Sequence, residues 1–146
     1  MSAPIKRLLD ELRVALEAQR ATVRVDVPDA CFPVAYESLA QGTGSLLGDL
    51  TDMTTQPVPR ILAESGGQVV QEDSAADFPG DALFHEMRER FGGVRAQIVS
   101  GCYRDGNLLA LLSIHDLRAP RRFSEAERGL CRAAAAAIAG ELDGPA

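Results

Sequence analysis

Two serines, a cysteine and a histidine fall within one short apolar stretch of this 146-residue chain, at Ser100, Cys102, Ser113 and His115. Hydroxyl, thiol and imidazole groups act as nucleophiles or bases, or fix a small molecule by hydrogen bonds. Small-molecule pockets are mostly apolar and carry a few polar groups of this kind. The stretch therefore contains the first candidates for a functional site.

The dipeptide Asp105-Gly106 between two apolar runs predicts a two-residue β-hairpin over residues 94–116. Uninterrupted pairing outward from the turn places alternate residues of both strands on one face. That face is predicted to carry Ala96, Ile98, Ser100, Cys102, Leu109, Leu111, Ser113 and His115. The other face is mostly apolar and is expected to pack against helices. Because buried polar groups need partners, the first face predicts a pocket, unless the middle of the chain closes over it and satisfies these groups with its backbone.

A catalytic pair of Cys102 and His115 is disfavoured by the same pairing. The two residues would lie at opposite ends of the strands, roughly 20 Å apart at ~3.3 Å per residue, which is too far for proton transfer. The three cysteines are odd in number and include no Cys-x-x-Cys pair, so neither a disulfide framework nor a zinc site is indicated. No catalytic residue, metal site or cofactor is assigned from the sequence.

The elements that must position these residues follow from hydrophobic periodicity and turn signals. We expect a helix over residues 5–16, an antiparallel pair of strands at 22–27 and 31–39, an irregular segment at 40–57, a short helix at 60–65, a strand at 68–71, a helix from Asp81 to Phe91, and a last helix capped by Ser124 and Glu127. The last helix is expected to bury Leu130, Ala134, Ala137, Ile138 and Leu142. Phe84 and His85 lie on the predicted helix above the pocket and are expected to meet a ligand there.

Charge and hydropathy limit the partners. The net charge of −6 would repel a nucleic acid, so direct nucleic-acid binding is not expected. No apolar run approaches the ~20 residues that a membrane span needs, and the N-terminus lacks the apolar core of a signal peptide. We therefore expect a cytoplasmic protein with no membrane contact, folded as one domain over residues 1–146 with its core at about 4–142.

The residues from 94 to 142 resemble the C-terminal half of a GAF domain. The similarity lies in the turn and strand of residues 105–115, which end in Ser-Ile-His, and in Pro-Arg-Arg-Phe-Ser-Glu-Ala-Glu at 120–127. Residues 68–73 are similar to the family's short strand that ends in Asp. The resemblance implies a mixed α/β (α+β) fold: an antiparallel sheet with the terminal helices on one face and a ligand pocket under the middle segment on the other. It also implies that His115 faces this pocket.

The resemblance and the hairpin together predict a small-molecule-binding sensory or regulatory domain rather than an enzyme. Its predicted ligand-binding residues are Phe84, His85, Ala96, Ile98, Ser100, Cys102, Leu111, Ser113 and His115. We expect a homodimer through the terminal helices, acting in signal transduction through a regulatory protein partner. One alternative is a small redox enzyme of this fold that uses Cys102, like the methionine sulfoxide reductases, although residues 66–93 lack the cysteines of that group. Another is an interaction domain with a vestigial pocket.

Overall fold

The computed structural model describes residues 3–27, 31–49, 51–64 and 67–142. The elements follow one another as α1 (Ala3–Ala15), β1 (Arg20–Val25), β2 (Val34–Leu39), the 3₁₀ turn η1 (Met53–Thr55), α2 (Pro57–Glu64), β3 (Gln68–Gln71), α3 (Ala82–Arg90), β4 (Ala96–Arg104), β5 (Asn107–Asp116) and α4 (Glu125–Leu142). This order confirms the predicted one. The first strand begins two residues earlier than predicted, and α2 begins three residues earlier.

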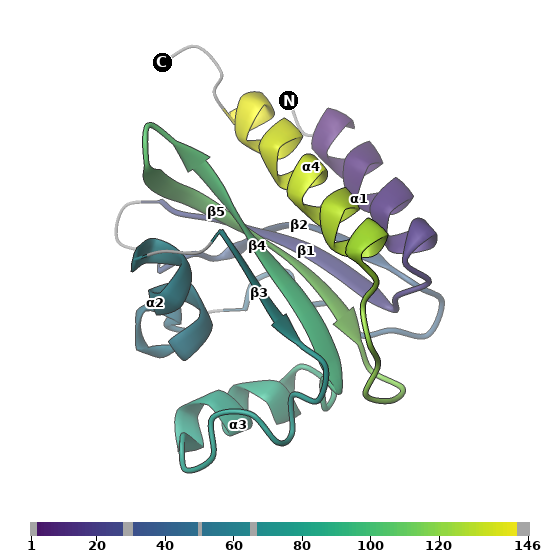
Figure 1. Cartoon of the computed structure of the whole chain (residues 1–146), viewed down its shortest axis with the longest axis vertical. Helices are drawn as coiled ribbons and strands as arrows, with labels where there is room; N and C mark the ends of the chain where they lie inside the picture. Colours follow the sequence, from purple (N-terminus) through teal and green to yellow (C-terminus); the bar gives the residue numbers. More distant parts are fainter. Residues whose placement is uncertain (1–2, 28–30, 50, 65–66, 143–146) are drawn as a thin grey trace.

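The five strands form one antiparallel sheet in the order β2-β1-β5-β4-β3. Helices α1 and α4 lie side by side across one face of this sheet, and α2 and α3 lie on the opposite side (Figure 1). We call the first the helical face and the second the middle-segment face, because the described residues between β2 and β4, apart from β3, cover it. The arrangement confirms the predicted fold class.

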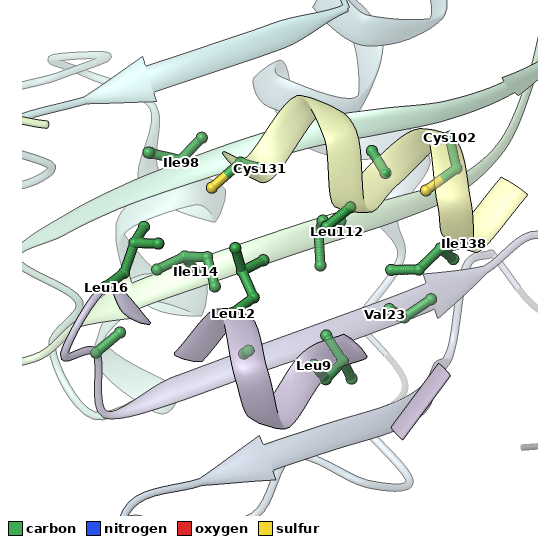
Figure 2. Packing of buried hydrophobic residues seen from close by; sticks show 14 of the residues in the cluster. Leu9, Leu12, Leu16, Val23, Ile98, Cys102, Leu112, Ile114, Cys131 and Ile138 are labelled. Atoms are coloured by element: carbon green, nitrogen blue, oxygen red, sulfur yellow. The ribbon is translucent and has the colours of Figure 1, made fainter. Parts of the chain in front are cut away.

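The helical face carries the larger hydrophobic core. Apolar residues of α1 and α4 pack there against inward residues of β1, β4 and β5. Figure 2 shows Ile98, Cys102, Leu112 and Ile114 of the hairpin together with Leu9, Leu12, Cys131 and Ile138 of the two helices. Burial of this much apolar surface is the main force that holds α1 and α4 on the sheet.

The middle-segment face carries a second core. Met53, Val58 and Leu62 of η1 and α2, and Phe84, Met87 and Phe91 of the α3 region, pack there with Val99 and Leu111 of the hairpin. Asp81 caps α3 as predicted, because its side chain accepts a hydrogen bond from the Phe84 amide at 3.0 Å. The middle segment is therefore packed onto the sheet.

The last helix begins as predicted and differs in the residues it buries. Ser124 and Glu127 form a reciprocal capping box. The Ser124 amide donates to the Glu127 carboxylate at 2.8 Å, and the Glu127 amide donates to the Ser124 hydroxyl at 3.0 Å. The prediction that Leu130 and Ala137 are buried was wrong. Both are exposed, and Leu130 keeps 48% of its surface, because they face the groove between α1 and α4 rather than the sheet.

The predicted register of the hairpin was also wrong. The turn forms at Asp105 and Gly106, but the pairing then shifts, so that Cys102 lies opposite Ala110 instead of Leu109. Leu109 is the additional residue of a β-bulge. Beyond the bulge, every residue of β4 faces the side of the sheet opposite to the predicted one.

None of the helices in the described part of the chain combines the length and the apolar character that a bilayer crossing requires.

Candidate functional site

A row of four buried polar side chains crosses the middle-segment face, one from each of four neighbouring strands. Gln71 of β3 pairs with Gln97 of β4, Gln97 pairs with His115 of β5, and His115 pairs with Arg20 of β1. Directly paired residues of an antiparallel sheet share a face. Polar groups as bulky as these are rarely buried, so a row of them marks this end of the sheet as unusual.

Further polar residues extend the row along β1 and β5. Thr22 pairs with Ser113, and Arg24 pairs with Leu111. All of these are buried except for small fractions of their surfaces. We define the polar sheet face as Arg20, Thr22, Arg24, Gln71, Gln97, Ser113 and His115. It lies under the middle segment, where the predicted pocket belongs.

Arg20 is one of two deeply buried arginines of this face, and each keeps 2% of its surface exposed. Its Nη1 donates to the Phe91 carbonyl at 2.7 Å, and its Nε and Nη2 donate to the Gly44 carbonyl at 3.3 and 3.1 Å. No carboxylate of the described residues forms an ion pair with it. Burial lowers the pKa of Arg20, against the longer-range field of Glu37. A guanidinium remains charged under these conditions, so Arg20 is a buried cation with no directly bonded carboxylate among the described residues.

His115 lies beside Arg20, with its Nδ1 3.1 Å from the Arg20 Nη1. Phe91 stacks over the imidazole at 6.2 Å between ring centroids and 22° between ring planes. Burial, followed by the charges of Arg20 and Arg24, holds the pKa of His115 well below its usual range. His115 is therefore a neutral hydrogen-bonding group at the base of the site.

Arg24 differs from Arg20 because it has a carboxylate partner. Its Nη2 donates to Asp49 at 2.9 Å, and its Nη1 donates to the Phe32 carbonyl at 3.1 Å. The guanidinium also lies 5.3 Å from the centre of the Phe91 ring, within range of a cation–π interaction. Burial raises the pKa of Asp49, but hydrogen bonds from Thr51 and Arg24 outweigh it and hold the pKa below its usual value.

Arg20 is covered by a loop that forms hydrogen bonds to the Glu37 carboxylate. We call residues 40–49 the lid loop. Glu37 of β2 accepts hydrogen bonds from the Leu46 amide at 2.8 Å and from the Ser45 hydroxyl. The lid loop contains Gly42 and Gly48 at φ +85° and +84°, a backbone region that other residues rarely adopt. The lid loop is therefore held over the site by its hydrogen bonds to Glu37 and by the Leu46 side chain, which packs in the second core.

At the other end of the row, the side-chain amides of Gln71 and Gln97 form hydrogen bonds. Gln97 donates to the Gln71 side chain, and Gln71 Nε2 donates to Asp77 at 3.1 Å in the loop before α3. The nearby hydroxyl of Ser74 is fully buried and has no partner in the structure. Such a group is commonly satisfied by an ordered water.

A pocket of about 490 Å³ opens at the other end of β1 and β5 from Arg20 and His115, between α2, η1 and the hairpin turn. Its walls include Phe32, Met53 and Leu108, with Asp26 and Arg60 also in the lining. This volume falls within the ~300–1,000 Å³ of small-molecule sites. Phe32 links the two regions, because it lines the pocket and its carbonyl accepts the bond from Arg24.

The structure brings together only some of the predicted site residues. Leu111, Ser113 and His115 lie on the middle-segment face as predicted, and Phe84 is buried in the core of the same side. His85 instead makes local contacts, at 3.3 Å from both the Phe78 carbonyl and Arg88 Nε.

The predicted placement of Ala96, Ile98, Ser100 and Cys102 was wrong. Because of the bulge at Leu109, three of them pack in the core under α1 and α4, and Figure 2 shows Ile98 and Cys102 there. The Ser100 hydroxyl accepts a hydrogen bond from Gln68 at 3.0 Å, and the same Gln68 amide donates to Arg128 of α4.

Sequence reasoning missed Arg20, Thr22 and Arg24. The sequence predicts a half-buried strand at 22–27, and Arg20 lies outside that range. In the structure both sides of β1 are buried, because α1 and α4 cover one face of the sheet and the middle segment covers the other. A signal was present, since placing β1 next to β5 aligns its polar residues with Ser113 and His115.

The buried thiols have no catalytic environment. Burial raises the pKa of Cys102 to about 12, and burial, with Glu127 adding to it, raises that of Cys131 to about 12. Cys31 is exposed, and a hydrogen bond to Asp52 raises its pKa. Reactive cysteines have lowered pKa values. Within the described residues, no group of three His, Cys, Asp or Glu side chains is arranged to hold a metal.

Solved structures with this fold come from several photoreceptors. The PixJ GAF domain of Thermosynechococcus elongatus, in its blue-light-absorbing form, is 19% identical, with a TM-score of 0.82 over 97% of this chain and 84% of that one. The photoproduct state of a GAF3 domain from Synechocystis is 22% identical, with a TM-score of 0.78 over 95% and 90%. The chromophore-binding domain of an R. palustris bacteriophytochrome is 20% identical, with a TM-score of 0.76 over 95% and 53%.

At identities this low, the structural likeness shows a common fold and no more. A comparison with curated protein sequences gives no significant match. The sequence model of the GAF domain family, however, matches residues 3–142. With the sheet, the flanking terminal helices and the covered polar face already described, this match over nearly the whole chain means that the protein belongs to the GAF domain family.

Proposed function

We propose that this chain is a sensory domain that binds a small molecule between the polar sheet face and the middle segment, without catalysing a reaction. The observation that carries the proposal is the row of Gln71, Gln97, His115 and Arg20 buried under a cover fastened by few contacts. A core needs no such row for stability, since apolar residues of similar size would fill the space at lower desolvation cost.

The partners of the two arginines support a replaceable cover. Arg20 is bonded to the carbonyls of Gly44 and Phe91, which belong to the lid loop and to the end of α3. A ligand that offers acceptors of its own can take the place of the Gly44 carbonyl when the lid loop moves. Phe32, whose carbonyl accepts a bond from Arg24, also lines the pocket at the other end of these strands.

The solved structures with this fold support the same conclusion. One of them is described as a chromophore-binding domain, and others as light-absorbing GAF domains. A fold that holds small molecules in those proteins is a reasonable framework for doing so here. The ligand of this chain is not inferred from them.

The burial of the Cys102 thiol agrees better with a binding role than with redox catalysis. Cys102 lies under α1 and α4, away from the polar sheet face, and burial raises its pKa to about 12. A thiol in that environment is a poor nucleophile at neutral pH. This argument disfavours the methionine-sulfoxide-reductase-like alternative.

We further propose that the domain acts in the cytoplasm as a homodimer through α1 and α4 and signals to a regulatory protein partner. A mainly apolar groove of about 310 Å³ runs between the two helices, lined by Leu8, Leu12, Ala15, Leu130, Ala133, Ala134 and Ala137, with Glu11. Exposed apolar residues on both helices are typical of an interface between copies of a chain. Movement of the sheet on ligand binding would then reach the dimer through helices packed directly on it.

The test is native mass spectrometry of the freshly purified protein, followed by a thermal-shift screen against small metabolites. We expect a non-covalent adduct that is lost on denaturation, or a metabolite that raises the melting temperature in a concentration-dependent way. A bare chain mass together with no stabilising compound in the screen would contradict the proposal and favour the vestigial-pocket alternative.

A further inference from the structure

We propose that the molecule bound at this site carries a carboxylate or phosphate group, and that Arg20 is the residue that receives it. The inference rests on the proposed sensory function and names the chemical class of its ligand. It follows from the charges and contacts of the polar sheet face.

Arg20 has no directly bonded carboxylate among the described residues, although Glu37, which pairs with Thr22 on the same face, adds a negative charge nearby. Arg20 and Arg24 supply two positive charges, and Asp49 neutralises that of Arg24 through a 2.9 Å ion pair. His115 is neutral, since burial lowers its pKa. Glu37 acts on Arg20 only over a longer range, and its oxygens are already engaged by Ser45 and Leu46. A buried guanidinium without a paired carboxylate is costly, and an anion relieves that cost.

The hydrogen bonds of Arg20 show where such an anion fits. Its Nε and Nη2, which form one edge of the guanidinium fork, both donate to the single carbonyl of Gly44, at 3.3 and 3.1 Å. Carboxylates and phosphates present two oxygens to such an edge and form two parallel bonds. The Gly44 carbonyl therefore occupies the position proposed for the anion. It offers one oxygen to two donors, whereas a carboxylate or phosphate would offer one oxygen to each.

The other contacts of Arg20 hold it in place for this role. Nη1 is fixed by the Phe91 carbonyl at 2.7 Å and by His115 Nδ1 at 3.1 Å, both on the inner side of the site. Gly92, directly after Phe91, has φ +94°, and a Cβ there would lie 3.9 Å from Arg20 Nη2. The Nε–Nη2 edge of the Arg20 guanidinium is thus the edge whose hydrogen-bond partner, the Gly44 carbonyl, belongs to the lid loop.

Displacement of the lid loop is the conformational change that the proposal requires. Gly44 lies between Gly42 and Gly48, and no heavy atom lies within 4 Å of a Cβ built on it. Apart from the Gly44 carbonyl, the loop is held by the two bonds to Glu37, by the Leu46 side chain and, at its end, by the ion pair of Asp49 with Arg24. An anion that replaces the Gly44 carbonyl would change the environment of the Gly44 and Leu46 amides.

The experiment uses a panel of small carboxylates, each paired with its primary amide, together with inorganic phosphate. Binding is measured at constant ionic strength by the ¹H–¹⁵N spectrum of the full chain. We expect the acids to bind about tenfold or more tightly than their amides, since bonds to a charged acceptor are stronger than neutral ones. We also expect shifts at the amides of Gly44 and Leu46.

Variants locate the effect at Arg20. Arg20→Gln should abolish the preference for the acid, and Arg20→Lys, which keeps the charge but not the fork, should retain part of it. Arg7→Gln, at an exposed position of α1, removes the same charge far from the site and should change nothing.

The outcomes separate this inference from the proposed function. Equal binding of acids and amides overturns the inference and leaves a sensor of neutral molecules. An acid preference that survives in Arg20→Gln also overturns it, because the anion is then received by another residue. Absence of binding by every member of the panel, with no adduct in native mass spectrometry, overturns both.

Discussion

The Nη1 of Arg20 lies 3.1 Å from the Nδ1 of His115, with both side chains buried in the sheet face under the middle segment. A guanidinium only donates hydrogen bonds, so Nδ1 must accept and the proton of the neutral imidazole belongs on Nε2. The contact therefore fixes both the charge and the tautomer of His115. It also links β1 to β5 at the row of polar residues on which the proposed function depends.

Protonation of His115 should destabilise the fold in mildly acidic solution. Its pKa in the folded state is well below its usual value, because of burial and then the charges of Arg20 and Arg24. Below about pH 6.5 the unfolded chain binds a proton that the folded chain does not, so stability falls as the pH falls through this value. We expect a loss of up to about 1.4 kcal/mol per pH unit between pH 6.5 and 5.5 from urea unfolding.

In the variant His115→Gln, the free energy of unfolding should no longer fall between about pH 6.5 and 5.5. Carboxylates such as Asp49 and Asp116, whose pKa values are lowered in spite of burial, destabilise the fold only at lower pH, below about 4. An identical slope in His115→Gln, or ring ¹⁵N shifts that show a protonated Nδ1 at pH 7, would refute the assignment.

Removing the partner of Arg24 should be costly. Asp49→Asn leaves the buried Arg24 guanidinium with weaker acceptors, and we expect a loss of about 1.5–3 kcal/mol in the free energy of unfolding. The matched control is Asp10→Asn, which breaks the exposed pair of Asp10 with Lys6 and should cost less than about 1 kcal/mol. Equal losses in the two variants would mean that the Arg24 pair is not a buried one.

The three thiols should differ in their reaction with Ellman's reagent. Cys31 is exposed and should react in the native protein, whereas Cys102 and Cys131 are buried, with pKa values of about 12, and should react only after unfolding. Cys31→Ser should abolish the native reaction. Rapid labelling of Cys102 in the folded chain would instead revive the redox alternative.

The proposed dimer can be tested at one residue. Leu130→Glu places a charge in the groove between α1 and α4 and should shift the protein from dimer to monomer in light scattering. Leu83→Glu is the control, because Leu83 on α3 is 52% exposed and Leu130 is 48% exposed. A wild-type protein that is monomeric at all concentrations, or equal effects of both substitutions, would exclude this interface.

Much of the fold was predictable because its signals are local. The turn at Asp105 and Gly106, the Asp81 cap and the capping box of Ser124 and Glu127 each depend on a few adjacent residues, and all three form as predicted. The order of elements and the two covered faces followed from them and from the resemblance to the family.

The part of the site on β4 was not predictable for a physical reason. The run from Leu108 to Leu112 is apolar at every position, so it has no alternation that would reveal an additional residue. The bulge at Leu109 therefore had no signature, and it reversed the faces of Ile98 and Cys102. Arg20 and Arg24 were missed because burial of a strand on both sides depends on its neighbours, which lie far away in sequence.

The polar sheet face is tested most directly by two serines that are equally buried on opposite sides of the sheet. Ser113 faces the middle segment and Ser100 faces α4, and each keeps less than a tenth of its surface exposed. The measurement is retention of the co-purified or screened molecule by Ser113→Val and by Ser100→Val in native mass spectrometry. We predict loss of the molecule from Ser113→Val and full retention by Ser100→Val. Retention by the first variant with loss from the second would contradict the account.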